Sequence, residues 1–243
     1  MKVEARNNLL RKLSGYEWGA CPHTLRTTAL ALCYSAAEYA SPVWFNSKHA
    51  AYVDKARNET CRLVTGCLKP TNVDKVRVLA GIAPPSVRRE IVARAERTKA
   101  ETDSRHALFS YVPPQRRLKS RSSFMAASKT ISVCPSKDRL ELWTRAVPDI
   151  FPPDLLPIKE ELPPGADLNF HAFKSINRMR CMMGRSKANL CKWGYSEDDK
   201  CDCGNIQTME HLLLCPNNEF LCNFDDVLLA NDNAQKLVLK YRI

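Results

Sequence analysis

The stretch CDCGNIQTMEHLLLC, residues 201–215, determines how the end of this chain folds, because it gathers four metal-ligand side chains within fifteen residues. These are Cys201, Cys203, His211 and Cys215. Gly204 permits a turn after the first pair, and Thr208 can cap a helix that presents the second pair on one face. Zinc takes four such ligands tetrahedrally, and a closed set leaves no position for a substrate. The pattern therefore predicts a structural zinc site.

The remaining cysteines leave the ligand set open. Cys191 or Cys222 can replace one ligand, and the alternative interpretation is a group of buried cysteines beside a surface histidine. The chain has eleven cysteines at irregular spacing, which favours free thiols in a reducing compartment over a disulfide framework. No apolar run is long enough to span a bilayer, and the start lacks a signal-peptide pattern. We therefore expect an intracellular protein, in the cytoplasm or nucleus, without a membrane partner.

The net charge of +11 is concentrated in two segments that contain no acidic residue. Residues 104–137 contain seven Lys or Arg residues, and residues 168–196 contain six. Such blocks favour a surface for a polyanion, above all nucleic acid; the alternative is an ordinary solubilising surface. The predicted contacts to nucleic acid come from both blocks: Lys174, Arg178, Arg180, Arg185, Lys187, Arg116, Arg117, Lys119 and Arg121.

Hydrophobic periodicity predicts a mainly α protein in three parts. Residues 1–103 form a compact helical domain, with helices expected over residues 22–42, 47–66 and 72–81 and from a cap at Ser86 onward. Residues 104–166 are basic and rich in proline, which is typical of a stiff linker, with one short helix over residues 138–146. Residues 167–243 form a small domain that contains the zinc site, a helix capped by Asn223 and a closing helix around Leu237, Val238 and Tyr241.

The helix expected to start at Asn169 has two different faces. Its apolar face is formed by Phe170, Phe173, Ile176 and Met183. On another face, Lys174, Arg178 and Arg185 form a cationic stripe with Cys181, which can track phosphates or can simply face solvent. Trp193 and Tyr195 follow; such aromatic groups can stack on an unpaired base, although they more often pack within their own domain.

Several long phrases resemble one family. SINRMRCMMGRSKANLCKWGYSEDDKCDCGNIQTMEHLLLCP is similar to the carboxyl-terminal end of reverse transcriptases from non-LTR, LINE-type (jockey-like) retrotransposons. WGACPHTLRTTALALCYSAAEYASPVW, NETCRLVTGCLKPTNVDKVRVLAGIAPPSVRRE and RRLKSR look like the region that follows the polymerase palm in those enzymes. The resemblance covers nearly the whole chain.

The resemblance implies a thumb-like helical domain followed by an arginine-bearing segment and a CCHC zinc knuckle. It supports Cys201, Cys203, His211 and Cys215 as the CCHC positions, and it places Arg178, Arg180 and Arg185 in the arginine-bearing segment. In the family, the thumb holds the template-primer duplex and the terminal segment helps to bind RNA. The implied partners are therefore RNA or an RNA–DNA duplex, and the palm and fingers portion that this chain lacks.

The chain also departs from the family. A polymerase palm needs an aspartate pair in an F/Y-x-D-D turn plus a third aspartate for two magnesium ions, and this chain has neither in a fitting context. The Phe224-Asp225-Asp226 sequence lies beyond the knuckle and has no residue between the phenylalanine and the aspartates. We therefore expect a truncated, RNA-binding fragment without polymerase activity. The alternative is an inert or protein-binding helical domain whose zinc site only stabilises the fold.

Overall fold

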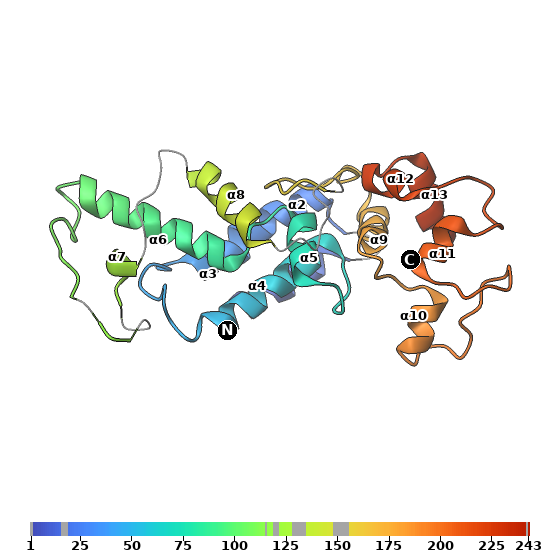
Figure 1. Cartoon of the computed structure of the whole chain (residues 1–243), viewed down its shortest axis with the longest axis horizontal. Helices are drawn as coiled ribbons and strands as arrows, with labels where there is room; N and C mark the ends of the chain where they lie inside the picture. Colours follow the sequence, from blue (N-terminus) through green and yellow to red (C-terminus); the bar gives the residue numbers. More distant parts are fainter. Residues whose placement is uncertain are drawn as a thin grey trace.

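The computed structural model describes residues 2–15, 19–114, 116–118, 122–127, 135–147, 156–241 and 243, and it confirms a mainly α fold. In chain order the helices are α1 (Lys2–Leu13), α2 (Pro22–Thr28), the π-helix η1 (Ala29–Tyr34), α3 (Ser35–Glu38), α4 (Ala50–Thr65), α5 (Val73–Ala80), α6 (Pro85–Thr102), α7 (Phe124–Ala127), α8 (Pro135–Ala146), α9 (Phe170–Arg180), α10 (Lys187–Lys192), α11 (Met209–Leu214), α12 (Phe224–Leu229) and α13 (Asp232–Tyr241). Within the described residues, extended backbone pairs only in an antiparallel bridge between Lys200 and Ile206. The molecule is elongated, with α6 and α7 towards one end and α10 to α13 at the other (Figure 1).

Local signals start and end the N-terminal helices much as predicted. Gly66 ends α4 and Gly81 ends α5, both with positive φ, which glycine adopts without a steric penalty. The Asn72 side chain caps α5 by accepting hydrogen bonds from the Asp74 and Lys75 amides. The predicted cap at Ser86 is wrong: α6 already begins at Pro85, because proline fits the first position of a helix.

Helix α1 was not predicted, because its buried face is narrow and contains a polar residue. That face consists of Val3, Asn7 and Leu10. The Asn7 side chain donates to the Ala56 carbonyl over 2.9 Å and accepts from the Thr60 hydroxyl over 2.7 Å, so it is satisfied within the packing against α4.

Two parts of the segment expected to be a stiff linker, residues 135–147 and 156–166, are instead docked onto the helical domain. Trp143 of α8 is completely buried in the N-terminal core. Gly81 lies so close to Glu161 that a Cβ atom at this glycine would be 2.0 Å from the Glu161 carbonyl oxygen. Arg26 donates to the Gly81 carbonyl over 2.8 Å and also to the Glu160 carbonyl. Residues 135–147 and 156–166 therefore contribute to the fold, because their apolar residues complete a core that the first helices leave open.

Helix α9 joins this core to a second one. Phe170 and Phe173 at its start belong to the N-terminal core. Ile176 and Met179, further along, belong to the C-terminal core, which α11, α12 and α13 complete. We refer to residues 168–243 as the C-terminal lobe and to the rest as the N-terminal lobe.

The other predicted helices of the C-terminal lobe are confirmed. Asn223 and Asp226 form a reciprocal capping box at the start of α12. Leu237 and Val238 of α13 are fully buried in the lobe. Among the described residues, none of the helices combines the length and the apolar character needed to cross a bilayer.

Candidate metal centre and basic groove

The four predicted metal ligands come together in the C-terminal lobe. One ligand atom each from Cys201, Cys203, His211 and Cys215 lies within 4.8 Å of all the others. The Cys201 and Cys215 Sγ atoms are 3.6 Å apart, and the Cys203 Sγ is 3.2 Å from Nε2 of His211. Cys201 and Cys215 are buried, while Cys203 and His211 are half-buried. This group can hold a metal ion.

Short-range structure places each ligand. The Gly204 amide donates to the Cys201 carbonyl over 2.8 Å, and Gly204 has a φ of +90°, so the chain turns tightly between the first two cysteines. The bridge between Lys200 and Ile206 closes this turn at its base. Thr208 accepts from the His211 amide over 3.1 Å and caps α11, as predicted. Cys215 follows directly as the residue that ends this helix.

Hydrogen bonds from the surrounding residues favour the thiolate form of the two buried cysteines of this group. Burial raises the pKa of Cys201, but hydrogen bonds from the Cys203 amide and from His211 lower it by more, so its pKa is below the ordinary value. Burial likewise raises the pKa of Cys215, and hydrogen bonds from the Tyr241 hydroxyl and the Asn217 amide outweigh it. Thiolates are the form that binds metal.

The other two cysteines that the sequence left open are not part of this group. Cys222 is buried in the C-terminal core, where its thiol lies 3.7 Å from the Asn223 carbonyl oxygen. Burial, with a smaller effect of Asp226, raises the pKa of Cys222 to about 11, which disfavours the thiolate that a metal ion requires. Cys191 lies on α10, outside the group.

Two of the predicted nucleic-acid contacts require correction, because Arg178 and Arg180 lie in the interior. Arg180 is only 2% exposed, and its guanidinium donates to the carbonyls of Pro164, Val227 and Leu228 over 2.8–3.1 Å. The last carbonyls of a helix lack partners within it, so Arg180 satisfies the end of α12. Burial lowers the pKa of Arg180 to about 10, and the side chain is still a cation at neutral pH. Arg180 is a structural residue.

Arg178 is also mostly buried, and the predicted stripe along one helix is wrong in its geometry. Helix α9 ends at Arg180, and Met182 turns the chain with a φ of +51°, so Arg185 is not on the same helix. Arg178 donates to the carbonyls of Gly66 and Ile243 over 3.0 and 3.2 Å. It nevertheless lines a hollow that leads to the surface.

This hollow gathers cations from both lobes. It has a volume of about 240 Å³. Arg62 and Lys69 line it from the end of α4 and the loop that follows, and Lys174 and Arg178 line it from α9. The Arg62 guanidinium donates to the carbonyls of Lys69 and Thr71 over 3.2 and 3.0 Å, which holds the loop in place. We call the hollow and the adjacent Arg185 the basic groove.

The electrostatics of the basic groove reflect crowding of like charge. Burial, then the charges of Arg178 and Arg185, lower the pKa of Lys174. Burial, then the charge of Arg185, lowers the pKa of Arg178 to about 10. The carboxylate at the rim, Glu59, is paired with Arg11 over 3.0 Å. Within the described residues, neither Lys69 nor Arg185 forms an ion pair. An anion in this groove relieves the repulsion between the cations.

The other predicted cations that the structure describes do not join this surface. Lys187 forms ion pairs with Asp198 and Asp202 over 3.4 and 3.6 Å. These ion pairs connect α10 to the loop that carries the metal ligands. Arg116 and Arg117 are exposed in the segment between α6 and α7, at the opposite end of the molecule from α10 to α13 (Figure 1). Lys119 and Arg121 lie outside the described residues. The described residues of the two basic blocks therefore do not form one continuous surface.

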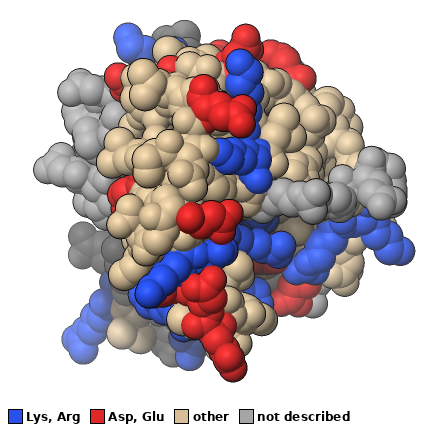
Figure 2. Space-filling model, turned by 90° about the vertical axis from the view of Figure 1, so that its right-hand side faces the viewer, with Lys and Arg blue, Asp and Glu red and all other residues tan. Residues whose placement is uncertain are grey.

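The outer face of the C-terminal lobe is not uniformly basic either. Figure 2 shows Lys and Arg side chains interspersed with Asp and Glu side chains on this face.

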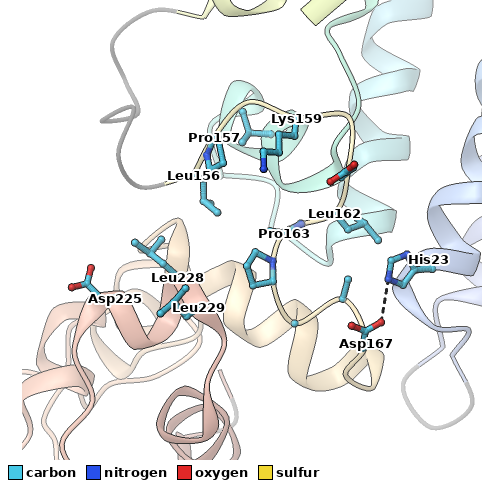
Figure 3. Close-up of a pocket in the computed structure, with 15 residues that line it drawn as sticks. His23, Leu156, Pro157, Lys159, Leu162, Pro163, Asp167, Asp225, Leu228 and Leu229 are labelled. Carbon is cyan, nitrogen blue, oxygen red and sulfur yellow. Dashed lines mark ion pairs between the residues drawn. The ribbon is translucent and has the colours of Figure 1, made fainter. Parts of the chain in front are cut away.

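A second hollow, of about 770 Å³, lies where residues 156–167 pass between α2, α5 and α12 (Figure 3). Its lining includes the carboxylates of Glu161, Asp167 and Asp225, and Asp167 lies 3.4 Å from His23 across one rim. These carboxylates repel phosphate, which leaves the basic groove as the best candidate for a polyanion.

Arg62 and Lys69 were not predicted as contacts, because they lie outside the two acid-free basic segments of the sequence. The available signal was the loop GCLKP, residues 66–70, in which a lysine lies between a helix-ending glycine and a proline.

No protein-family model, no curated protein and no solved structure matches the chain. The relation to non-LTR reverse transcriptases therefore stays a prediction from the quoted phrases.

Proposed function

We propose that this chain is a nucleic-acid-binding module that holds RNA by its phosphates in the basic groove. The observation that carries the proposal is the convergence of Lys69 from one lobe with Lys174 and Arg185 from the other. Phosphate contacts supply most of the affinity of such surfaces and carry little sequence information. RNA is the nucleic acid that the resemblance to retrotransposon reverse transcriptases implies. The proposed activity is binding alone, without polymerase chemistry.

A zinc ion in the Cys3His group completes the proposal. With Zn–S and Zn–N bonds of about 2.3 and 2.0 Å, tetrahedral coordination separates two thiolates by about 3.8 Å and a thiolate from an imidazole nitrogen by about 3.5 Å. The observed separations of 3.6 and 3.2 Å are within a few tenths of an ångström of these values. Three soft thiolates and one imidazole are a donor set typical of structural zinc. The ion, when bound, cross-links the turn at Cys201 to α11.

The zinc site supports the groove indirectly. Lys187 connects α10 to the metal-binding loop through Asp198 and Asp202. Asn189 of the same helix donates to the Gly184 carbonyl over 2.9 Å, next to Arg185. An ordered metal-binding loop therefore helps to fix the position of Arg185 relative to α9.

A salt titration tests the proposal. Each phosphate neutralised on a single strand contributes about −0.7 to the slope of log affinity against log salt concentration, so Lys69, Lys174 and Arg185 together predict a slope near −2. We expect the affinity of the full chain for a labelled single-stranded RNA to fall about 20-fold between 50 and 200 mM salt. Fluorescence anisotropy measures this directly. An affinity that is unchanged over this range would contradict phosphate binding.

A further inference from the structure

A wider hollow, of about 780 Å³, opens directly beside the basic groove. One wall is formed by Leu68 and Pro70 of the loop after α4. The other wall is formed by Leu190, Trp193 and Tyr195, from α10 and the turn that ends it. The two lobes thus enclose an apolar and aromatic slot at their junction. Its volume lies in the range of pockets that bind organic ligands.

Cations stand at the edge of this slot. Lys69 lines both the slot and the smaller hollow of the basic groove, so the two adjoin at this residue. Arg185 lines the slot as well. Among the described residues that line it, there is no carboxylate. The slot therefore suits a flat apolar group that is attached to a negatively charged chain.

The end of α10 is built so that both aromatic side chains reach the slot. Gly194 adopts a φ of +77°, and the Tyr195 amide donates back to the Leu190 carbonyl over 2.9 Å. This reversal of the chain places Tyr195 on the same side as Trp193. Tyr195 is 80% exposed, so packing within the core of the C-terminal lobe does not explain the position of its side chain. Exposed aromatic groups beside cations are typical of surfaces that stack on nucleobases.

We propose that this slot binds an unpaired nucleobase, whose flanking phosphates lie against Lys69 and Arg185. A base within a duplex has both faces covered by its neighbours and its edge paired, so it cannot enter. The preferred ligand is therefore single-stranded nucleic acid. This inference rests on the proposed function, because the phosphates must occupy the basic groove for the base to reach the slot. Stacking on aromatic side chains tolerates any base, so the sequence preference is weak.

The experiment compares four ligands with the full chain: an eight-nucleotide RNA, the DNA of the same sequence, an abasic deoxyribose-phosphate oligomer of the same length, and an RNA duplex. The abasic oligomer matches the charge of the DNA but has no base to stack. We expect the DNA to bind at least about fivefold more tightly than the abasic oligomer, because fivefold is about 1 kcal/mol, the lower end of what one stacked base contributes. The duplex should bind more weakly per phosphate than the single-stranded RNA.

Two variants identify the slot as the cause. Tyr195→Leu and Trp193→Leu should each reduce the preference for the DNA over the abasic oligomer at least about threefold, since each leaves one aromatic stacking surface. Tyr195 is exposed, so its replacement leaves the fold intact. Tyr39→Leu is the matched control, because Tyr39 is 83% exposed and lies outside the slot; it should leave the preference unchanged.

The outcomes separate this inference from the proposed function. Equal binding of the abasic oligomer and the DNA, with a steep salt dependence, would overturn the base slot and leave phosphate binding in place. Absence of binding to every ligand would overturn both. Tighter binding of RNA than of DNA, with the abasic oligomer weakest, would support the slot and show that the 2′-hydroxyl is recognised. Equal binding of RNA and DNA, with the abasic oligomer weaker than both, would support the slot and show that the 2′-hydroxyl is not recognised.

Discussion

Arg178 donates from Nε to the carbonyl oxygen of Gly66 over 3.0 Å and so joins α9 to the end of α4. The Asn177 side chain makes a parallel contact, to the Thr65 carbonyl over 3.1 Å. The last carbonyls of α4 have no partners within their own helix, and side chains 112 residues further along the chain satisfy them. The basic groove exists because this junction brings the loop after α4 against α9.

The junction predicts a specific sensitivity at Gly66. An alanine Cβ at this position would lie 2.2 Å from the Cβ of Lys174, and the φ of +70° is unfavourable for any residue with a side chain. We expect Gly66→Ala to lower the free energy of unfolding by roughly 3 kcal/mol, of which about 1 kcal/mol comes from the backbone conformation and the rest from the steric clash. Urea denaturation of the full chain measures this.

Gly194→Ala is the matched control for the Gly66 variant. Gly194 has a similar φ, of +77°, but no atom lies within 4 Å of the Cβ that alanine would add. This variant should lose only the backbone contribution of about 1 kcal/mol. Equal losses for both variants would show that the close approach of the two lobes at Gly66 is absent in solution.

Arg180 should prove essential for stability. Replacement by methionine keeps most of the volume but leaves the carbonyls of Pro164 and Leu228 without the donor that Arg180 supplies, and it leaves the Val227 carbonyl with the Ala230 amide as its donor. Each unsatisfied buried carbonyl costs about 1–3 kcal/mol, so we expect Arg180→Met to lower the free energy of unfolding by about 3 kcal/mol or more. Arg185→Met, at an exposed site, should change it by less than about 0.5 kcal/mol. Similar curves for both variants would contradict the structural role of Arg180.

The metal site makes a prediction about stoichiometry. Native mass spectrometry of the full chain should count one zinc ion, and a Cys203→Ser, His211→Ala double variant should retain none, because two of the four ligands are lost. A Cys191→Ser, Cys222→Ser double variant should keep the full zinc content, since neither cysteine belongs to the group. Retention by the first variant, or loss by the second, would show that the ligand set differs from the one inferred.

Charge removal at the groove should change the salt dependence of RNA binding. Neutralising two cations reduces the magnitude of the slope by roughly 1.4 on a single strand, so we expect this change for a Lys69→Gln, Arg185→Gln double variant. Arg178 is unsuitable for this test, because its replacement also breaks the contact to Gly66. The control is an Arg116→Gln, Arg117→Gln variant, which removes the same charge at the other end of the molecule. If both variants alter the slope equally, binding is not localised in the groove.

Features that depend on neighbouring residues could be predicted from the sequence. The metal ligands span only fifteen residues, so a turn at Gly204 and a helix capped by Thr208 suffice to bring them together. Asn72, Gly81 and Asn223 begin or end helices where expected, because capping involves hydrogen bonds to the next few residues.

Which cations are buried and which line the groove could not be predicted from neighbouring residues. Periodicity assigns Lys174 and Arg178 to one face of α9, but it does not reveal that α4 covers part of that face or that the end of α12 surrounds Arg180. Lys69 and Arg185 are more than a hundred residues apart, and no local pattern shows that the two line one groove. By itself the sequence determined the helices that carry clear capping signals and the metal-ligand group, since short-range hydrogen bonds and turns define them. Only the tertiary structure decided which arginines are buried supports and which cations line the groove, because this depends on how the two lobes pack against α9.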